Sequence, residues 1–273
     1  MINQADLNSI KTNGADVTQS RLSKIEDGTR KNYFSLLPSP ERIRESIPNS
    51  FVIINPMNTV GGDGYWFAEN DKSILLAVFD CMGHGHLASM MARTYIKLLR
   101  QIIDEQGIFF PNEVLLEIHR AVQKKFKNNG VKKSLLGTGA DFGIVRINKT
   151  IREMEFSGAK MNLYQVNDGE LSIIKADRIQ VGEYFEHDHE YVTHIIDLKK
   201  YDNSKFYLFS DGVTDLIGGP ENKKFGSARL KQLLESSFPY SMEEQKQQLV
   251  STLGKWQGSN MALDDVLLFG FSY

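Results

Sequence analysis

The stretch GYWFAENDKSILLAVFD, residues Gly64–Asp80, contains two apolar runs joined by a polar turn. Each run is short and rich in aromatic or branched residues, which predicts two β-strands paired as a hairpin with its turn at Glu69–Lys72. Further strands joined by hairpins follow, so the sheet is expected to be mainly antiparallel. The stretch ends on Asp80, which places a carboxylate where a buried strand is expected to end.

Helical periodicity occurs in pairs of segments. Apolar residues recur at helical spacing over residues 86–106 and 111–129, and two more helices are predicted shortly before the closing strand DDVLLFGFSY. The order is strands, two helices, many strands, two helices and one strand, which argues against a doubly wound sheet. The sequence therefore predicts an α+β fold, in which two antiparallel β-sheets pack as a sandwich flanked by helix pairs (α-β-β-α).

Composition limits the classes of protein that fit this chain of 273 residues. An apolar fraction of 41% supports a sizeable core, and a net charge of -2 gives no general attraction to nucleic acid or anionic membranes. A single cysteine excludes an internal disulfide and any zinc site with several cysteines. No signal peptide or membrane span is recognisable, so we expect a cytoplasmic protein with no membrane and no nucleic-acid partner.

Residues 1–45 differ from the rest of the chain. They are polar and lack strand signals, which predicts an N-terminal arm that is helical in part. The arm is interpreted as regulatory or dimer-forming, or as a tail packed on the domain. Residues 46–273 are predicted to form the main domain.

Four motifs place aspartates at strand ends or in glycine-flanked turns. A carboxylate beside the core is costly unless it is paired or bound to a metal, and no lysine or arginine lies within these motifs. Converging carboxylates favour a divalent cation, and oxygen ligands favour Mg or Mn over zinc. The alternative is that each aspartate only shapes its turn. The motifs are VGGDGYW (Asp63), LAVFDCMGHG (Asp80), YLFSDGVTD (Asp211 and Asp215) and ALDDVLLFG (Asp264 and Asp265).

The residues after Asp80 offer other chemistry. His84 and His86 have no third soft ligand nearby, so a zinc site is disfavoured. Cys81 is better explained as a small residue that fills a strand end than as a nucleophile. His84 is a candidate proton donor, whereas His86 is expected in the first turn of the following helix.

The motifs VGGDGYWF, VFDCMGHGHLASMMA, TGADFGIVRIN, EFSGAKMNLYQVNDGEL, FYLFSDGVTDLIG and LDDVLLFGF occur in this order. As an ordered set they resemble the bacterial stage II sporulation protein E type of metal-dependent serine/threonine phosphatase, within the protein phosphatase 2C superfamily. The resemblance covers roughly Tyr33 to the C-terminus. It implies two antiparallel sheets packed face to face and a centre with two divalent cations, Mn or Mg.

The resemblance also implies roles for individual residues. The metal ligands would be Asp63, Asp80 as the bridging ligand, the backbone carbonyl of Cys81, Asp211 and Asp264. Asp80 and His84 would be the catalytic residues. Asp215 would be an outer ligand, and Asp265 is an uncertain, structural candidate. The sequence departs from the family at Gly64, where a large aromatic residue is usual, and at Cys81.

The implied activity is dephosphorylation of a phosphoserine or phosphothreonine protein in bacterial signalling. In relatives the substrate is often a phosphorylated anti-anti-sigma-like protein of the STAS fold, and a homodimer is a further expectation. One alternative is a catalytically silent binding module that keeps the phosphatase fold. Another is a nuclease, for which the basic stretch at residues 119–133 is the only candidate groove.

Overall fold

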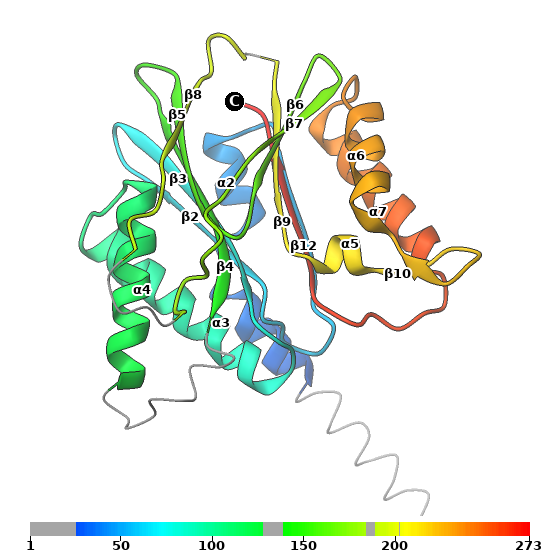
Figure 1. The fold of residues 1–273 in the computed structure, drawn as a ribbon, viewed down its shortest axis with the longest axis horizontal. Coiled ribbons are helices and arrows are strands. Elements are labelled where there is room, and N and C mark those ends of the chain that lie inside the picture. The colour runs from blue at the N-terminus through cyan, green and yellow to red at the C-terminus, as the bar shows by residue number, and fades with distance from the viewer. Residues whose placement is uncertain (1–25, 128–138, 184–188, 202) are drawn as a thin grey trace, which may run out of the picture.

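The computed structural model describes residues 26–127, 139–183, 189–201 and 203–273, and within them two five-stranded antiparallel sheets pack face to face (Figure 1). The first sheet contains, in spatial order, β1 (Ser50–Asn55), β12 (Val266–Phe271), β9 (Lys205–Phe209), β6 (Leu163–Asn167) and β7 (Glu170–Ile174). The second contains β2 (Gly64–Glu69), β3 (Ser73–Cys81), β4 (Ala140–Asn148), β5 (Glu153–Ala159) and β8 (His194–Asp197). The predicted α+β sandwich is confirmed.

Helix pairs cover the outer faces of the sandwich (Figure 1). Helices α3 (His86–Leu99) and α4 (Pro111–Lys127) contact the second sheet, and α6 (Gly226–Ser236) and α7 (Met242–Gln257) contact the first. The helix predicted over residues 86–106 forms as α3 but finishes in a π-helical segment, η1 (Arg100–Glu105). The short elements are α2 (Pro40–Ser46), α5 (Gly212–Asp215), β10 (Ile217–Gly218) and β11 (Lys223–Lys224). Among the described residues, no helix is both long and apolar enough to cross a membrane.

The central strands are buried on both faces. In β3 the sequence SILLAVFDC is apolar almost throughout, and all its residues except Asp80 are buried. This pattern arises because the second sheet lies between α3 and α4 on one side and the first sheet on the other. Phe79 stacks on Phe142 of β4 with ring centroids 5.2 Å apart. The residue that precedes Asp80 in β3 is therefore held by aromatic packing.

Part of the N-terminal segment packs on the main core. Residues 26–34 are helical, and Tyr33, Leu37 and Ile43 are buried in the cluster formed between the sheets and α3. Ser39 caps α2, since its Oγ accepts a hydrogen bond of 3.1 Å from the Arg42 backbone N–H. Residues 1–25 of the predicted arm lie outside the described residues.

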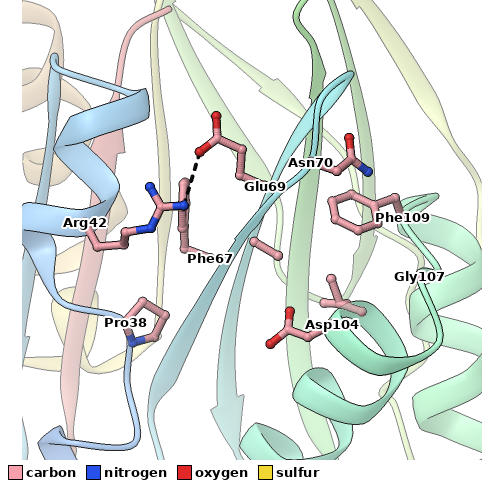
Figure 2. Close-up of a pocket in the computed structure, with 10 residues that line it drawn as sticks. Pro38, Arg42, Phe67, Glu69, Asn70, Asp104, Gly107 and Phe109 are labelled. Atoms are coloured by element: carbon pink, nitrogen blue, oxygen red, sulfur yellow. Dashed lines mark hydrogen bonds and ion pairs between the residues drawn. The ribbon is translucent and has the colours of Figure 1, made fainter.

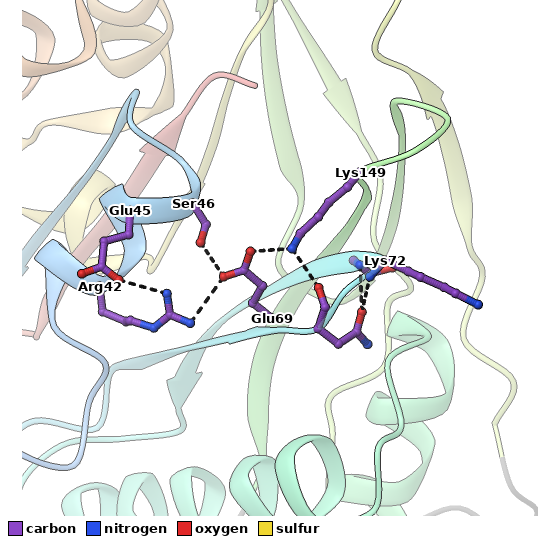
Figure 3. Close-up of polar contacts among 8 residues, drawn as sticks. Arg42, Glu45, Ser46, Glu69, Lys72 and Lys149 are labelled. Carbon is purple, nitrogen blue, oxygen red and sulfur yellow. Dashed lines mark hydrogen bonds and ion pairs between the residues drawn. The ribbon is translucent and has the colours of Figure 1, made fainter.

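A polar network around Glu69 ties α2 to the second sheet (Figure 3). The Glu69 carboxylate accepts hydrogen bonds from Ser46 Oγ at 2.5 Å, Lys149 Nζ at 2.5 Å and Arg42 Nη2 at 3.4 Å. Burial raises the pKa of Glu69, but these donors more than offset it, so the pKa lies below its ordinary value. The network lies at the end of β2 that is remote from Asp63.

Candidate functional site

The four aspartate motifs meet at one end of the sandwich. Strands β2 and β3 are antiparallel neighbours in one sheet, and β9 and β12 are antiparallel neighbours in the other. The start of one strand therefore lies beside the end of its partner in each sheet. Asp63 immediately precedes β2, Asp80 is the penultimate residue of β3, Asp211 follows β9 by two positions, and Asp264 precedes β12 by two positions.

Asp80 lies at the centre of this group of carboxylates. Burial is the largest cause that raises its pKa, to about 8, and the negative charges of Asp211, Asp141 and Asp264 raise it further. The backbone of Asp211 hydrogen-bonds to the Asp80 side chain and opposes this shift. Asp80 thus reaches across from the second sheet to the first, where its neighbours disfavour its ionised form.

Asp63 is almost completely buried, with 3% of its surface exposed. Its Oδ2 accepts a hydrogen bond of 2.6 Å from the Ser210 hydroxyl, which itself accepts the backbone N–H of Leu267 at 3.0 Å. The Tyr33 hydroxyl donates to the backbone carbonyl of Asp63. Burial raises the pKa of Asp63, as does the charge of Asp80, whereas the bond from Ser210 lowers it. The carboxylate is therefore fixed in orientation from the first sheet.

Asp264 and Asp265 have different environments. Asp265 is 4% exposed, and its two oxygens accept the backbone N–H groups of Met57 at 2.7 Å and Gly62 at 2.5 Å. It therefore fastens the loop that leads to Asp63. Asp264 is half-buried beside Asp211, and burial is the first cause that raises its pKa, while nearby His84 lowers it.

Two glycines allow this close packing around Asp265. A Cβ on Gly61 would lie 2.7 Å from the Asp265 carboxyl carbon, and a Cβ on Gly212 would lie 1.9 Å from its backbone oxygen. Any side chain at either position would push the loop or α5 away from the carboxylates. The glycines of the motifs are therefore required by the approach of the backbone segments to one another.

The turn after β3 places the remaining candidates. Cys81 is buried, and burial raises the pKa of its thiol, so a nucleophilic thiolate is disfavoured. Its carbonyl oxygen lies 3.4 Å from the position that a Cβ on Gly62 would take, which places it beside the Asp63 loop. His84 is exposed and close to Asp264, and His86 is the first residue of α3. His84 therefore faces solvent at the rim of the site.

Asp215 and Gly64 lie at the margins. Asp215 forms an ion pair with Lys224, in which Lys224 Nζ lies 2.6 Å from Asp215 Oδ2, and both side chains are substantially exposed. At Gly64, a Cβ would lie 2.3 Å from the Phe79 ring, so Phe79 occupies the space that a larger residue would need. This contact gives a physical reason for glycine at that position.

The sequence reasoning missed three polar residues of the site: Asp141, Gln180 and Ser210, which donates to Asp63 as described above. Asp141 is paired directly with Asp80 in the β3–β4 register, and the Gln180 side-chain amide donates to Asp141 Oδ1 at 2.6 Å. Burial is the main cause that raises the pKa of Asp141, with Asp211 adding to it. Asp141 lies in the motif TGADFGIVRIN at a strand start, a signal that could have identified it. Gln180 carries no comparable signal.

The donor chemistry of the site suits a hard divalent cation. The groups gathered at the site are carboxylates, and their charges raise one another's pKa values. Across the described ranges, no three His, Cys, Asp or Glu side chains are arranged so that they could hold a metal ion as they stand. Asp63 Oδ2 instead accepts a hydrogen bond from Ser210, so the carboxylates would have to rearrange to coordinate a cation.

A separate hollow of about 510 Å³ lies at the other end of β2 (Figure 2). Pro38, Phe67, Asp104 and Phe109 line it, and the Arg42 guanidinium lies 5.3 Å from the centre of the Phe67 ring. Phe67 is four residues from Asp63, or about 13 Å along a strand. The residues that line this hollow do not include the aspartates of the four motifs.

Comparisons with known proteins agree with the fold. The family model for stage II sporulation protein E (SpoIIE) matches residues 70–273. The chain is 25% identical over 218 residues to "Phosphoserine phosphatase RsbU" of Bacillus subtilis (strain 168), a match that covers 78% of this chain and 60% of that protein. The chain thus spans only about three fifths of the length of that relative.

Solved structures of similar fold were also found. The SiaA-PP2C domain of Pseudomonas aeruginosa superposes with a TM-score of 0.81 at 28% identity, covering 94% of this chain and 98% of that domain. RsbX in complex with magnesium gives a TM-score of 0.54 at 20% identity over 82% of this chain and 94% of that chain, which supports the fold. The match of the family model to three quarters of the chain, on a sandwich with aspartates gathered at one end, establishes that this chain belongs to the stage II sporulation protein E (SpoIIE) family.

Proposed function

We propose that this chain is a metal-dependent protein serine/threonine phosphatase that uses two divalent cations, Mn or Mg. The proposal rests on one observation: Asp63, Asp80, Asp211 and Asp264 gather at one end of the sandwich, where their negative charges repel one another. These residues and the carbonyl of Cys81 would hold the cations, with Asp80 as the bridging ligand. When bound, such ions lower the pKa of water and offset charge on a phosphoryl group.

The chain's own residues would position the ligands and move the proton. Ser210 holds Asp63 through its bond of 2.6 Å, and Asp265 holds the preceding loop through Gly62. The leaving seryl or threonyl oxygen needs a proton, and His84 is proposed as its donor because it is exposed beside Asp264. Asp215 is proposed as an outer residue, since Lys224 neutralises it.

The proposed substrate is a phosphoserine or phosphothreonine protein. The name of the relative RsbU, a phosphoserine phosphatase, supports this class of substrate. A phosphorylated STAS-type regulatory protein, a homodimeric state and a cytoplasmic location are finer proposals that rest on the resemblance described above. Within the proposed domain of residues 46–273, the acidic positions are all present, which favours an enzyme over a silent binding module.

The test is hydrolysis of p-nitrophenyl phosphate and of a phosphoserine peptide, with Mn, with Mg and with a chelator. We expect turnover only with a divalent cation, and we expect Asp80→Asn and Asp211→Asn to lose nearly all of it. Asp71→Asn, in an exposed turn at the far end of β3, is the matched control and should keep full activity. Full activity in folded Asp80→Asn or Asp211→Asn protein would refute the proposed site. Absence of turnover by the wild type would favour the silent module.

A further inference from the structure

The outer face of α3 carries a row of basic side chains, two of which form no ion pair with a described residue. Arg93 and Lys97 are exposed, one helical turn apart, and neither forms an ion pair with any residue that the structure describes. Arg100 continues the row at the start of η1, where Asp104 lies close enough to feel its charge. We call Arg93, Lys97 and Arg100 the α3 basic row.

This row borders a chain of hollows. Arg93 lines three of them, with volumes of about 560, 440 and 780 Å³, which follow one another along the helix. The first begins at Gly85 and His86, directly after the turn that carries His84. The second also includes Lys125 of α4, and the third includes Lys97 and Arg100. Basic side chains thus line a series of hollows that leads away from the carboxylate site, and the acidic residues Asp104 and Glu105 lie only in the hollow at its far end.

Apolar side chains lie where this surface meets the site. Met82, Leu87 and Met90 are 43%, 46% and 46% exposed, although they are large and apolar. Met90 lines two of the hollows that Arg93 also lines. Exposed apolar groups beside unpaired charges are typical of a surface that contacts another protein.

We propose that the α3 basic row docks acidic residues of the phosphoprotein substrate while its phosphoserine occupies the carboxylate site. The proposal rests on the proposed phosphatase function, and it adds the charge that the substrate must carry. Arg93 lies seven residues beyond His86, or about 10 Å along the helix, which an extended peptide covers in about three residues. Lys97 and Arg100 lie about 6 and 10 Å further. The favoured acidic positions are therefore about three to six residues from the phosphoserine.

Charge argues against two other occupants. A second copy of this chain placed with the same face would oppose one basic row to another, which is repulsive. The N-terminal residues 1–25 contain Asp6 and Asp16 against Lys11, Arg21 and Lys24, so they offer no net negative charge. An acidic partner protein complements the row better than either.

The experiment compares phosphoserine peptides that differ only in flanking charge. One peptide carries aspartates at three to six residues from the phosphoserine, a second carries serines there, and a third carries lysines. We expect kcat/KM to be about fivefold higher for the acidic peptide than for the neutral one, as two exposed ion pairs would give. The preference should shrink at high salt.

The variant Arg93→Glu/Lys97→Glu should reverse the preference and leave turnover of p-nitrophenyl phosphate unchanged. The matched control is Lys72→Glu/Lys199→Glu, which makes the same charge change on exposed residues outside α3 and its hollows. We expect it to retain the preference for the acidic peptide. Equal preferences in the wild type and the α3 variant would overturn the proposal.

Binding separates this proposal from the proposed function. Fluorescence anisotropy with the labelled acidic peptide should show weaker binding to the α3 variant, whether or not the protein hydrolyses any substrate. If the wild type has no phosphatase activity but this difference persists, the proposed function fails and the docking surface stands. If an unstructured RNA oligonucleotide of equal charge binds the row more tightly than the peptide does, the assignment to an acidic protein is overturned.

Discussion

Replacing Asp80 with asparagine should stabilise the protein in the absence of metal and remove its stabilisation by metal. Burial and the charges of Asp211 and Asp141 raise the pKa of Asp80 to about 8. The folded protein therefore holds a proton that the unfolded chain releases near pH 4. Stability from this proton is complete below about pH 4 and is lost as the pH rises through about 8.

The magnitude follows from that difference in pKa. A pKa of about 8 against the ordinary 3.8 corresponds to a ceiling of about 6 kcal/mol at high pH. Asp80 is not fully buried and its neighbours can relax, so we expect about 2 kcal/mol in practice. Asparagine keeps the shape and removes the charge. Asp80→Asn should therefore exceed the wild type in free energy of unfolding by about 2 kcal/mol at pH 9.

The assay is urea unfolding with a chelator at pH 5, 7 and 9, repeated with Mn. The advantage of Asp80→Asn should grow with pH. Saturating Mn should stabilise the wild type by about 3 kcal/mol at a hundredfold excess over Kd and should leave the variant unchanged. Asp71→Asn controls for loss of an exposed carboxylate. If Asp80→Asn is less stable than the wild type at pH 9 without metal, repulsion at this site is not the governing effect.

Three further changes test the supporting contacts. Ser210→Ala removes the 2.6 Å bond to Asp63, and we expect about tenfold weaker activation by Mn in a metal titration, whereas unchanged activation would contradict the positioning role. Asp265→Asn sets an amide against the N–H of Met57 or Gly62, so urea unfolding should show a loss of about 2–4 kcal/mol, more than for Asp264→Asn. Glu69→Gln should cost about 1 kcal/mol at pH 7, and because the folded pKa of Glu69 is lowered, this cost should vanish as the pH falls through that pKa. A cost for Glu69→Gln that does not fall at all as the pH is lowered from 7 would contradict the charge argument.

The sequence predicted the features that depend on local pattern. The β2–β3 hairpin and α3 follow from the spacing of apolar residues, which each segment carries within itself. The gathered aspartates were predicted because strand ends are recognisable and because the motifs resemble a known family. The π-helical ending of α3 had no signal in the pattern, since its residues continue the apolar spacing of the helix.

The features that sequence reasoning missed depend on contacts between distant segments. Asp141 faces Asp80 only through the register of β4 against β3. Asp265 holds Gly62 across 203 positions of the chain, and Ser210 holds Asp63 across 147. No local period or spacing encodes such pairs, so their roles emerge only when the two sheets are packed together.

The position of β12 sets an order on assembly during synthesis. This strand lies between β1 and β9, yet it follows both of them along the chain. As the chain leaves a ribosome, β1 and β9 therefore have no shared neighbour until residues 266–271 emerge, and Asp264 arrives just before that strand. Nascent chains halted before residue 264 should gain nothing from added Mn, whereas chains that extend to residue 273 should acquire protease resistance in a single step.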